Sequence, residues 1–350
     1  MICCQGDNSK FIIHNSKFTL LAIFNPEHDL CLANGDANYV PPASALRFAR
    51  QEAHLMKSIY GDDCEACAAE DVKHTQALKQ SIVAWGWNKV LVTQLCKQGV
   101  PRELMPGDGQ LETIRQLSHR RTAASARQRF FADAPAVSEA TGIGDVEHLL
   151  SRMGRIVLKA PWSGSGRGLR WVDGSLSELD KKWVEKILAT QGSVMVEPRL
   201  DVVQDFALEY YIGVQPAEVS GRKPLDVGQH SILPCAGTHF WGYSLFSTQN
   251  GVYRENRLLS DEQILQHLSE YVPMQAILSA KAAIEEWLET EIAPQYEGPL
   301  GIDMFIYRIA DGYALNPMVE INFRHTMGHV AVALRNKMPG RTFCPVVGSN

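Results

Sequence analysis

No stretch of the sequence is apolar over the length that a membrane-spanning helix needs, so we expect no contact with a membrane. The N-terminus lacks the basic region and long apolar stretch of a signal peptide, which favours a cytoplasmic protein. Basic residues are not in excess, because the formal net charge is −5, and we expect no nucleic acid partner. Internal repeats and low-complexity runs are also missing. What remains is an ordinary globular composition, 45% hydrophobic and 21% charged.

The eight cysteines are scattered and form no disulfide framework, which indicates a reducing compartment. Cys64 and Cys67 make one C-x-x-C pair. A zinc site of the finger type needs a second pair of cysteines or histidines at close spacing, and none follows. We therefore interpret both side chains as ordinary thiols.

A chain of 350 residues is long enough for two or three domains. Residues 1–17 are expected to form a loose extension. Residues 18–110 alternate strand and helix patterns, which is typical of a small α/β domain. The expected elements are an apolar strand at 20–24, a helix at 43–57 that starts after two prolines, a short strand at 81–87 and a helix at 88–98.

A polar cluster, Glu27-His28-Asp29, comes just after strand 20–24. In open α/β sheets, ligands bind at the carboxyl ends of the strands. We therefore expect His28 to face a substrate. The alternative is a polar turn that only caps the next segment.

The segment 298–328 predicts two strands around a tight turn at Asp311-Gly312. That turn would place Asp303 opposite Glu320, with Asn322 on the same face. Two opposed carboxylates repel, so a cation is expected between them, and hard oxygen ligands favour Mg²⁺.

Two features of the same segment affect this prediction. Pro317 removes a ladder donor and often marks a bulge, which could shift the register by one. Arg324 would add a fixed cation on the same face as the acids. The alternative interpretation is a surface hairpin with scattered acidic residues.

The segment 155–174 predicts a strand that ends at Lys159, a loop rich in glycine, and a second strand at 169–172. A helix is expected only after these strands, at a capping box formed by Ser175 and Glu178. Walker A and Rossmann loops both open directly into a helix, so neither fits. A glycine-rich loop between antiparallel strands can instead close over phosphates as a flap, with Lys159 as a point charge. The alternative is a hairpin loop that binds nothing.

The order of these parts resembles the ATP-grasp superfamily over residues 118–334. The segments that carry the resemblance are SHRRTA, IVLKAPWSGSGRGLRWV, VMVEPRL, GPLGID and PMVEINFRHTMG. The resemblance implies an α/β fold in which two lobes clasp ATP, after an N-terminal α/β domain like a pre-ATP-grasp domain. The implied ATP-grasp domain is 111–340, with a flap lobe at about 135–198 and a metal-bearing lobe at about 199–340. Residues 341–350 are expected to be a loose tail.

The resemblance also implies roles for individual residues. ATP contacts would come from the phosphate lysine, the flap and the hinge acid, which are Lys159, Ser163, Gly164, Ser165, Gly166, Arg167, Gly168 and Glu197. Mg²⁺, or Mn²⁺ in its place, would be held by Asp303, Glu320 and Asn322. Arg324 matches a position that holds the reacting phosphate or carboxylate, and His325 is expected to face the substrate beside it.

One motif departs from the family pattern. SHRRTA stands where many members have Asp-Lys, so the first basic nucleotide contact is assigned to Arg121, with Arg120 as the alternative.

The implied activity is that of an ATP- and Mg²⁺-dependent ligase, which activates a carboxylate as an acyl phosphate for attack by an amine of an amino acid or peptide-like substrate. The alternatives are a phosphotransferase of the same fold and a nucleotide-binding relative without turnover. The sequence leaves the two substrates unidentified. It also leaves the oligomeric state open, with a homodimer as one option.

Overall fold

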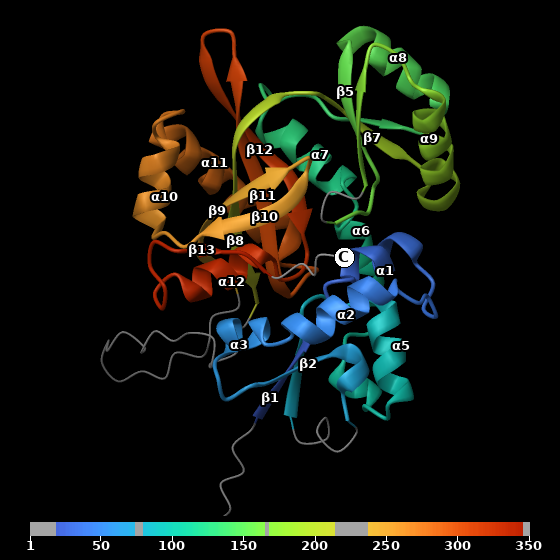
Figure 1. The fold of residues 1–350 in the computed structure, drawn as a ribbon, viewed down its shortest axis with the longest axis vertical. Coiled ribbons are helices and arrows are strands. Elements are labelled where there is room, and N and C mark those ends of the chain that lie inside the picture. Colours follow the sequence, from blue (N-terminus) through green and yellow to red (C-terminus); the bar gives the residue numbers. More distant parts are fainter. Residues whose placement is uncertain (1–18, 74–79, 165–167, 214–236, 346–350) are drawn as a thin grey trace, which may run out of the picture.

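The computed structural model describes residues 19–73, 80–164, 168–213 and 237–345. The expected extension 1–17 and the flap residues Ser165, Gly166 and Arg167 lie outside these ranges. The described chain forms three sheets, each with its own helices, grouped around a common centre (Figure 1). No helix within these ranges has the length and apolar character needed to cross a membrane.

The first sheet contains the parallel strands β1 (Thr19–Phe24), β2 (Glu65–Ala68) and β3 (Gln80–Ala84) in the order β2-β1-β3. Alternate residues of β1 enter different cores, with Ala22 and Phe24 on one side and Leu21 and Ile23 on the other. Strand β1 is therefore buried on both faces, as its unbroken apolar pattern predicts.

Helices cover both faces of this sheet. They are α1 (His28–Asn34), α2 (Ala43–Glu52), α3 (Leu55–Tyr60), α5 (Lys89–Lys97) and α6 (Asp108–Leu117), with short 3₁₀ turns at Ala69–Asp71 and Arg102–Leu104. The single helix expected at 43–57 is thus two helices, separated at Ala53 and His54. Burial raises the pKa of Cys67 in β2 to about 12, which keeps that thiol protonated.

The second sheet has the order β4-β7-β5-β6, with all neighbours antiparallel. Its strands are β4 (Ser138–Ala140), β5 (Arg155–Lys159), β6 (Leu169–Asp173) and β7 (Val194–Pro198), and α8 (Ile143–Met153) and α9 (Glu178–Gln191) pack on it. The expected capping box at Ser175 and Glu178 is wrong by two residues. Ser177 is the cap, and its hydroxyl accepts from the backbone N–H of Asp180.

The third sheet has six strands in the order β12-β11-β8-β9-β10-β13. They are β8 (Asp201–Ile212), β9 (Thr238–Gln249), β10 (Val252–Arg257), β11 (Gly298–Ile309), β12 (Gly312–Asn322) and β13 (Thr342–Phe343). Strand β13 pairs with β10, so the expected loose tail at 341–350 is ordered at its start.

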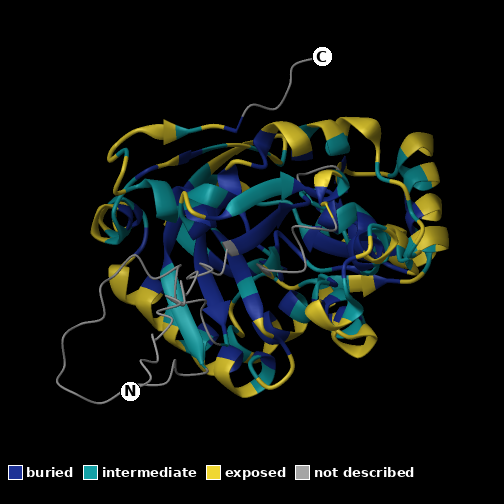
Figure 2. Cartoon of the chain, turned by 90° about the horizontal axis from the view of Figure 1, so that it is seen from below, coloured by how far each residue is buried: buried dark blue, intermediate teal, exposed yellow. Residues whose placement is uncertain are grey.

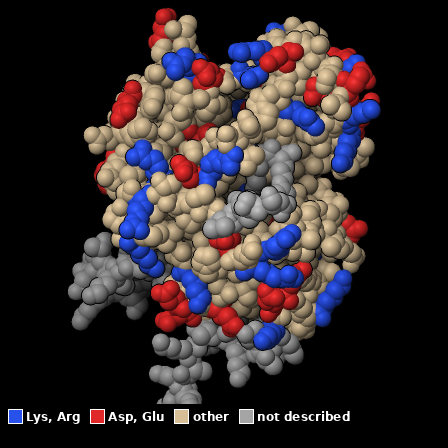
Figure 3. All heavy atoms as spheres, in the orientation of Figure 1, with Lys and Arg blue, Asp and Glu red and all other residues tan. Residues whose placement is uncertain are grey.

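Two sets of helices flank the six-stranded sheet. The helices α7 (Arg121–Phe130), α10 (Asp261–Leu268) and α11 (Met274–Trp287), with a π-helical turn at Leu288–Ile292, pack on the face that carries Phe206 and Leu208. The opposite face, which carries Glu209, meets α12 (Met327–Leu334). Buried strands form the centre of the molecule, and exposed positions lie mainly on helices and turns (Figure 2). Lys and Arg are interspersed with Asp and Glu on the face drawn in Figure 3.

Candidate functional site

The antiparallel pair β11 and β12 places Asp303 directly opposite Glu320, as the sequence predicts. The turn itself lies one position earlier than expected, at Ala310 and Asp311, because Ile309 pairs with Gly312. A regular ladder from that turn would pair Asp303 with Met318.

A bulge in β12 corrects the register. Phe305 pairs with Asn316, and the next pair recorded is Asp303 with Glu320, so β12 contains two additional residues between these points. They fall around Pro317, which has no N–H to donate, and Met318, whose φ of 50° is left-handed. The predicted pairing is therefore correct although the predicted turn is not.

The acids of this hairpin face one another in a partly buried place. Burial raises the pKa of Asp303 well above its usual value, and the negative charges of Glu320 and Glu209 raise it further. Asn322 donates its amide to Asp303 at 3.2 Å. Glu209 lies behind the hairpin, where its carboxylate accepts hydrogen bonds from Ser244 and Thr326. Such a concentration of negative charge is stabilised by a cation.

This donor set fits one hard divalent cation such as Mg²⁺, which takes one or two carboxylates and keeps water or phosphate as its other ligands. Within the described residues no group of three or more His, Cys, Asp or Glu side chains could hold a metal. The candidate ligands are instead the two carboxylates of Asp303 and Glu320 with the amide of Asn322. The amide oxygen of Asn322 already accepts one hydrogen bond from Arg324 and keeps a second lone pair.

Arg120 connects this hairpin to the flap root, by which we mean the described ends of the glycine-rich loop, Ser163, Gly164 and Gly168. Its guanidinium contacts Glu320 at 2.8 Å and donates to the backbone oxygens of Ala160 and Ser163 at 3.1 and 3.2 Å. Arg121, which was assigned the first basic contact, is exposed and pairs with Glu139 at 2.6 Å. Arg120, the alternative, is thus the cation that lies between the flap and the acids.

Lys159 and Glu197 form a buried ion pair at 2.9 Å, in which each side chain is 9% exposed. They come from the neighbouring strands β5 and β7 of the second sheet. Burial lowers the pKa of Lys159, and the nearby charge of Arg120 lowers it further, while Glu197 acts in the opposite direction. Burial alone would raise the pKa of Glu197, but the charges of Lys159 and Arg127 lower it below its usual value. The two residues predicted to contact ATP therefore contact each other.

The described ends of the flap are closely packed. A side chain on Gly168 would collide with Ser163, and one on Gly164 would lie 2.0 Å from a carboxylate oxygen of Asp29. Only glycine fits at either position without movement of its neighbours. The flap root therefore lies against α1 of the first sheet.

Arg324 is held on several sides. Its Nε and Nη2 both donate to the carboxylate of Asp29, at 3.0 and 2.7 Å, Nη2 also donates to Asn322, and Nη1 donates to the backbone oxygen of His325. Burial alone would lower the pKa of Arg324, but Asp29 raises it above its usual value. The expected contact of Arg324 with a reacting group would require it to release one of these partners.

His28 and His325 were expected to face the substrate, and the structure contradicts both expectations. His28 is 1% exposed and bonds through Nδ1 to Asn88, and His325 is fully buried and bonds to the hydroxyl of Tyr60. Burial lowers the pKa of His28 to about 4, so the ring is neutral near pH 7. Both rings belong to the contact between the first and third sheets, where His325 also donates its backbone N–H to Trp85.

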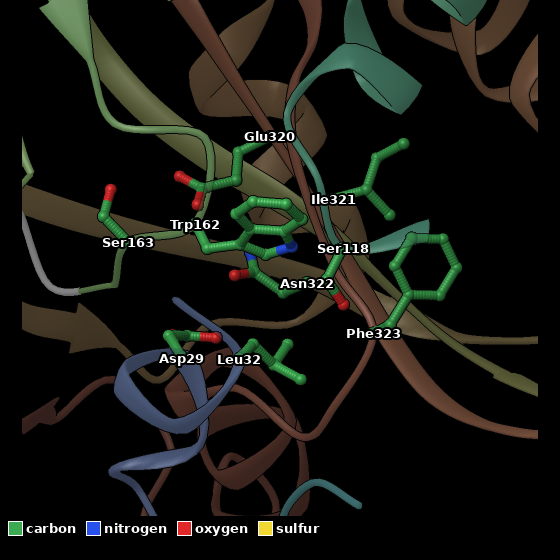
Figure 4. Close-up of a pocket in the computed structure, with 9 residues that line it drawn as sticks. All are labelled: Asp29, Leu32, Ser118, Trp162, Ser163, Glu320, Ile321, Asn322 and Phe323. Atoms are coloured by element: carbon green, nitrogen blue, oxygen red, sulfur yellow. The ribbon is translucent and has the colours of Figure 1, made fainter. Parts of the chain in front are cut away.

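A small pocket, partly open to solvent, lies where the flap root, α1 and β12 meet. It is lined by Asp29, Leu32, Ser118, Trp162, Ser163, Glu320, Ile321, Asn322 and Phe323. Figure 4 shows the indole of Trp162 between Glu320 on one side and Asn322 and Asp29 on the other. The acids and the flap root thus share one cavity.

Comparisons with known proteins give matches in structure alone. Neither the models of known protein families nor the sequences of characterised proteins match this chain. N5-carboxyaminoimidazole synthetase from Staphylococcus aureus, solved with ADP, is 13% identical over 95% of this chain and 79% of its own, with a TM-score of 0.50. Biotin carboxylase from Campylobacter jejuni, in a β-γ-ATP complex, is 15% identical over 90% of this chain and 67% of its own, with a TM-score of 0.46.

The chain has the ATP-grasp fold. The four-stranded sheet lies in the range expected for the flap lobe, and the six-stranded sheet lies mainly in the range expected for the metal-bearing lobe. Lys159 projects from the first of these lobes and Glu320 from the second, and Arg120 lies between them. The expectation of an α/β fold of ATP-grasp type is confirmed.

Three residues of the site carried no assigned role in the sequence prediction. Asp29 belongs to the polar cluster after β1, but His28 of that cluster was chosen. Trp162 follows Lys159 by three residues and was treated as part of the loop, and Glu209 was not singled out. The signal for Asp29 was its place at the carboxyl end of a strand, where ligands bind in α/β sheets.

Proposed function

We propose that this chain is an ATP- and Mg²⁺-dependent ligase that joins a carboxylate to an amine. A carboxylate oxygen of the substrate attacks the γ-phosphorus of ATP, and ADP leaves. The amine nitrogen then attacks the acyl carbon, the bond from that carbon to the phosphate oxygen breaks, and a proton passes to solvent. The products are an amide, ADP and phosphate. The fold supports this proposal, since the Staphylococcus aureus synthetase was solved with ADP.

The observation that carries the proposal is the placement of charge in the two sheets. Asp303 and Glu320 lie opposite each other in the six-stranded sheet, and Lys159 projects from the four-stranded sheet. Two carboxylates held close together in a partly buried place repel each other unless a cation lies between them. That arrangement suits the triphosphate of ATP, because Mg²⁺ neutralises phosphate charge while the lysine binds another phosphate oxygen.

The chain's own residues would act by positioning and by electrostatics. Lys159 would hold a phosphate oxygen, and the flap from Ser163 to Gly168 would supply backbone N–H groups. Glu197 would accept a hydrogen bond from the ribose, and Asp303, Glu320 and Asn322 would hold Mg²⁺ or Mn²⁺. Arg120 would transfer its contact from Glu320 to a phosphate once the metal takes that carboxylate.

Release of ADP tests the proposal. The protein is incubated with ATP, Mg²⁺ and pairs drawn from a panel of small carboxylic acids and amino acids. A ligase releases ADP and phosphate in equal amounts, and only when both co-substrates are present. ADP release with a single acceptor, together with phosphate bound to that acceptor, would replace the ligase with a phosphotransferase. Failure of every pair to release ADP, alongside normal ATP binding, would indicate a relative without turnover.

A further inference from the structure

The charged side chains that line the pocket between the flap root, α1 and β12 are both carboxylates. Asp29 and Glu320 present carboxylate oxygens, which only accept hydrogen bonds when ionised. Burial would raise the pKa of Asp29, but the charge and hydrogen bonds of Arg324 lower it below its usual value. Asp29 therefore remains an anion at neutral pH.

The neighbouring cations are already engaged. Arg324 uses four of its five N–H groups on Asp29, Asn322 and the backbone of His325. Neither Arg324 nor Arg120 is among the residues that line the pocket. A ligand in this space therefore meets two carboxylates and otherwise only neutral polar groups, the hydroxyls of Ser118 and Ser163 and the amide of Asn322. This balance of charge favours an ammonium group over a carboxylate.

One wall of the pocket is apolar and firmly held. Trp162 donates its indole N–H to the backbone oxygen of Arg115 at 2.8 Å, and its backbone N–H to Gln191 at 2.9 Å. The guanidinium of Arg115 lies 4.2 Å from the centre of the indole. Leu32 and Phe323 complete the apolar wall. This wall suits the hydrocarbon part of a small molecule.

We infer that this pocket binds the amine substrate, with its ammonium group on Asp29 and its apolar part against Trp162. The inference rests on the proposed ligase function and gives it a substrate class, a small primary amine or amino acid with an apolar side chain. Arg324 is then a positioning residue, since it fixes the carboxylate of Asp29 by two parallel hydrogen bonds and keeps it ionised. A carboxylate oxygen has more than one lone pair, so Asp29 can bind Arg324 and an ammonium together.

The geometry of the flap agrees with this placement. The backbone of Gly164 lies against Asp29, so a bound ammonium would be covered on one side by the flap root. Glu320, a proposed metal ligand, lines the same space as Asp29. An amine held there lies next to the place where the acyl phosphate would form.

Binding of amines can be measured without turnover. The probes are the common amino acids and phenethylamine, each compared with the analogue in which a hydroxyl group replaces the amino group. Melting-temperature shifts identify the probes that bind in the presence of MgADP, and calorimetry gives their dissociation constants. The variant is Asp29→Asn, which keeps the shape of the side chain and removes its charge.

Asp261→Asn is the matched control. Asp261 also forms a two-bond ion pair with an arginine, Arg335, at 2.5 and 3.1 Å, and the exposure of that pair is similar, but it does not line the pocket. Both variants are first compared with the wild type for melting temperature and for ADP affinity. These two measurements separate a loss of amine binding from general damage to the fold.

We expect at least one apolar amino acid or phenethylamine to bind, and its hydroxyl analogue to bind at least about 30-fold more weakly. Asp29→Asn should weaken the amine by a similar factor and leave ADP within about 2-fold, whereas Asp261→Asn should leave both unchanged. The inference is overturned if no amine binds, if amine and hydroxyl analogue bind equally, or if Asp29→Asn retains wild-type affinity. Amine binding without ADP release from any substrate pair would instead overturn the proposed function and leave this site standing.

Discussion

Replacing Lys159 with methionine should have two separable effects, one on stability and one on nucleotide binding. The lysine forms a buried ion pair with Glu197, and both side chains are 9% exposed, so solvent screens the pair weakly. Removal of one partner of a buried pair typically costs about 3–5 kcal/mol, because the other charge is left uncompensated. Arg127 also lowers the pKa of Glu197, so we expect the lower end of that range, about 3 kcal/mol.

The second effect follows from the proposed contact with phosphate. An unpaired phosphate charge in a partly desolvated cleft should weaken ATP by roughly 2–5 kcal/mol, which is at least about 30-fold in the dissociation constant. Urea unfolding without nucleotide measures the first effect, and calorimetric titration with ATP measures the second. Lys281→Met is the control, since Lys281 also pairs with a glutamate, Glu285, but in helix α11.

The double variant Lys159→Met, Glu197→Gln separates the two roles. It removes both charges, so much of the lost stability should return while ATP binding stays weak. If the single variant lost stability but bound ATP with wild-type affinity, Lys159 would have only a structural role. The phosphate assignment would then be wrong.

Three further predictions concern the metal hairpin, the flap root and the buried histidine. Glu320→Gln or Asp303→Asn should abolish ATP turnover and leave the circular dichroism spectrum unchanged; wild-type turnover with Mg²⁺ would disprove the metal assignment. Arg120→Ala should weaken ATP binding by at least about 10-fold, whereas Arg121→Ala should leave the calorimetric affinity for ATP unchanged. The opposite result for the two variants would favour Arg121 as the nucleotide contact. The pKa of His28 is about 4 in the folded chain and 6.5 when unperturbed, so the unfolded chain binds the proton first. The free energy of unfolding should therefore fall between pH 6.5 and 4, and a smaller fall is expected in His28→Gln; an identical pH profile for this variant would contradict that pKa.

The local patterns predicted the ATP-grasp parts well because each depends on nearby residues. A strand that ends in Lys159, a glycine-rich loop and a second strand follow directly from the sequence. The pairing of Asp303 with Glu320 was predicted from a turn at the wrong position. It is correct because a bulge around Pro317 offsets the misplaced turn. The proline signalled a bulge, but its size depends on the packing of Met318, which the sequence does not reveal.

Contacts between distant segments were beyond this reasoning. Arg120 and Arg121 are adjacent and identical in chemistry, and only the packing of α7 determines which of them faces Glu320. His28 and Asp29 are likewise neighbours, and the short helix α1 buries one and places the other in the pocket. Arg324 pairs with a residue 295 positions away. No local pattern could indicate that partner.

Transfer of oxygen from the carboxylate to phosphate tests the central claim most directly. The carboxylic acid of an active substrate pair is labelled with ¹⁸O in both oxygens, and the phosphate released in the presence of ATP, Mg²⁺ and the amine is examined by ³¹P nuclear magnetic resonance. Activation as an acyl phosphate predicts that one labelled oxygen appears in each phosphate formed. ADP and phosphate released with all of the label left in the acid or the amide would contradict the ligase mechanism.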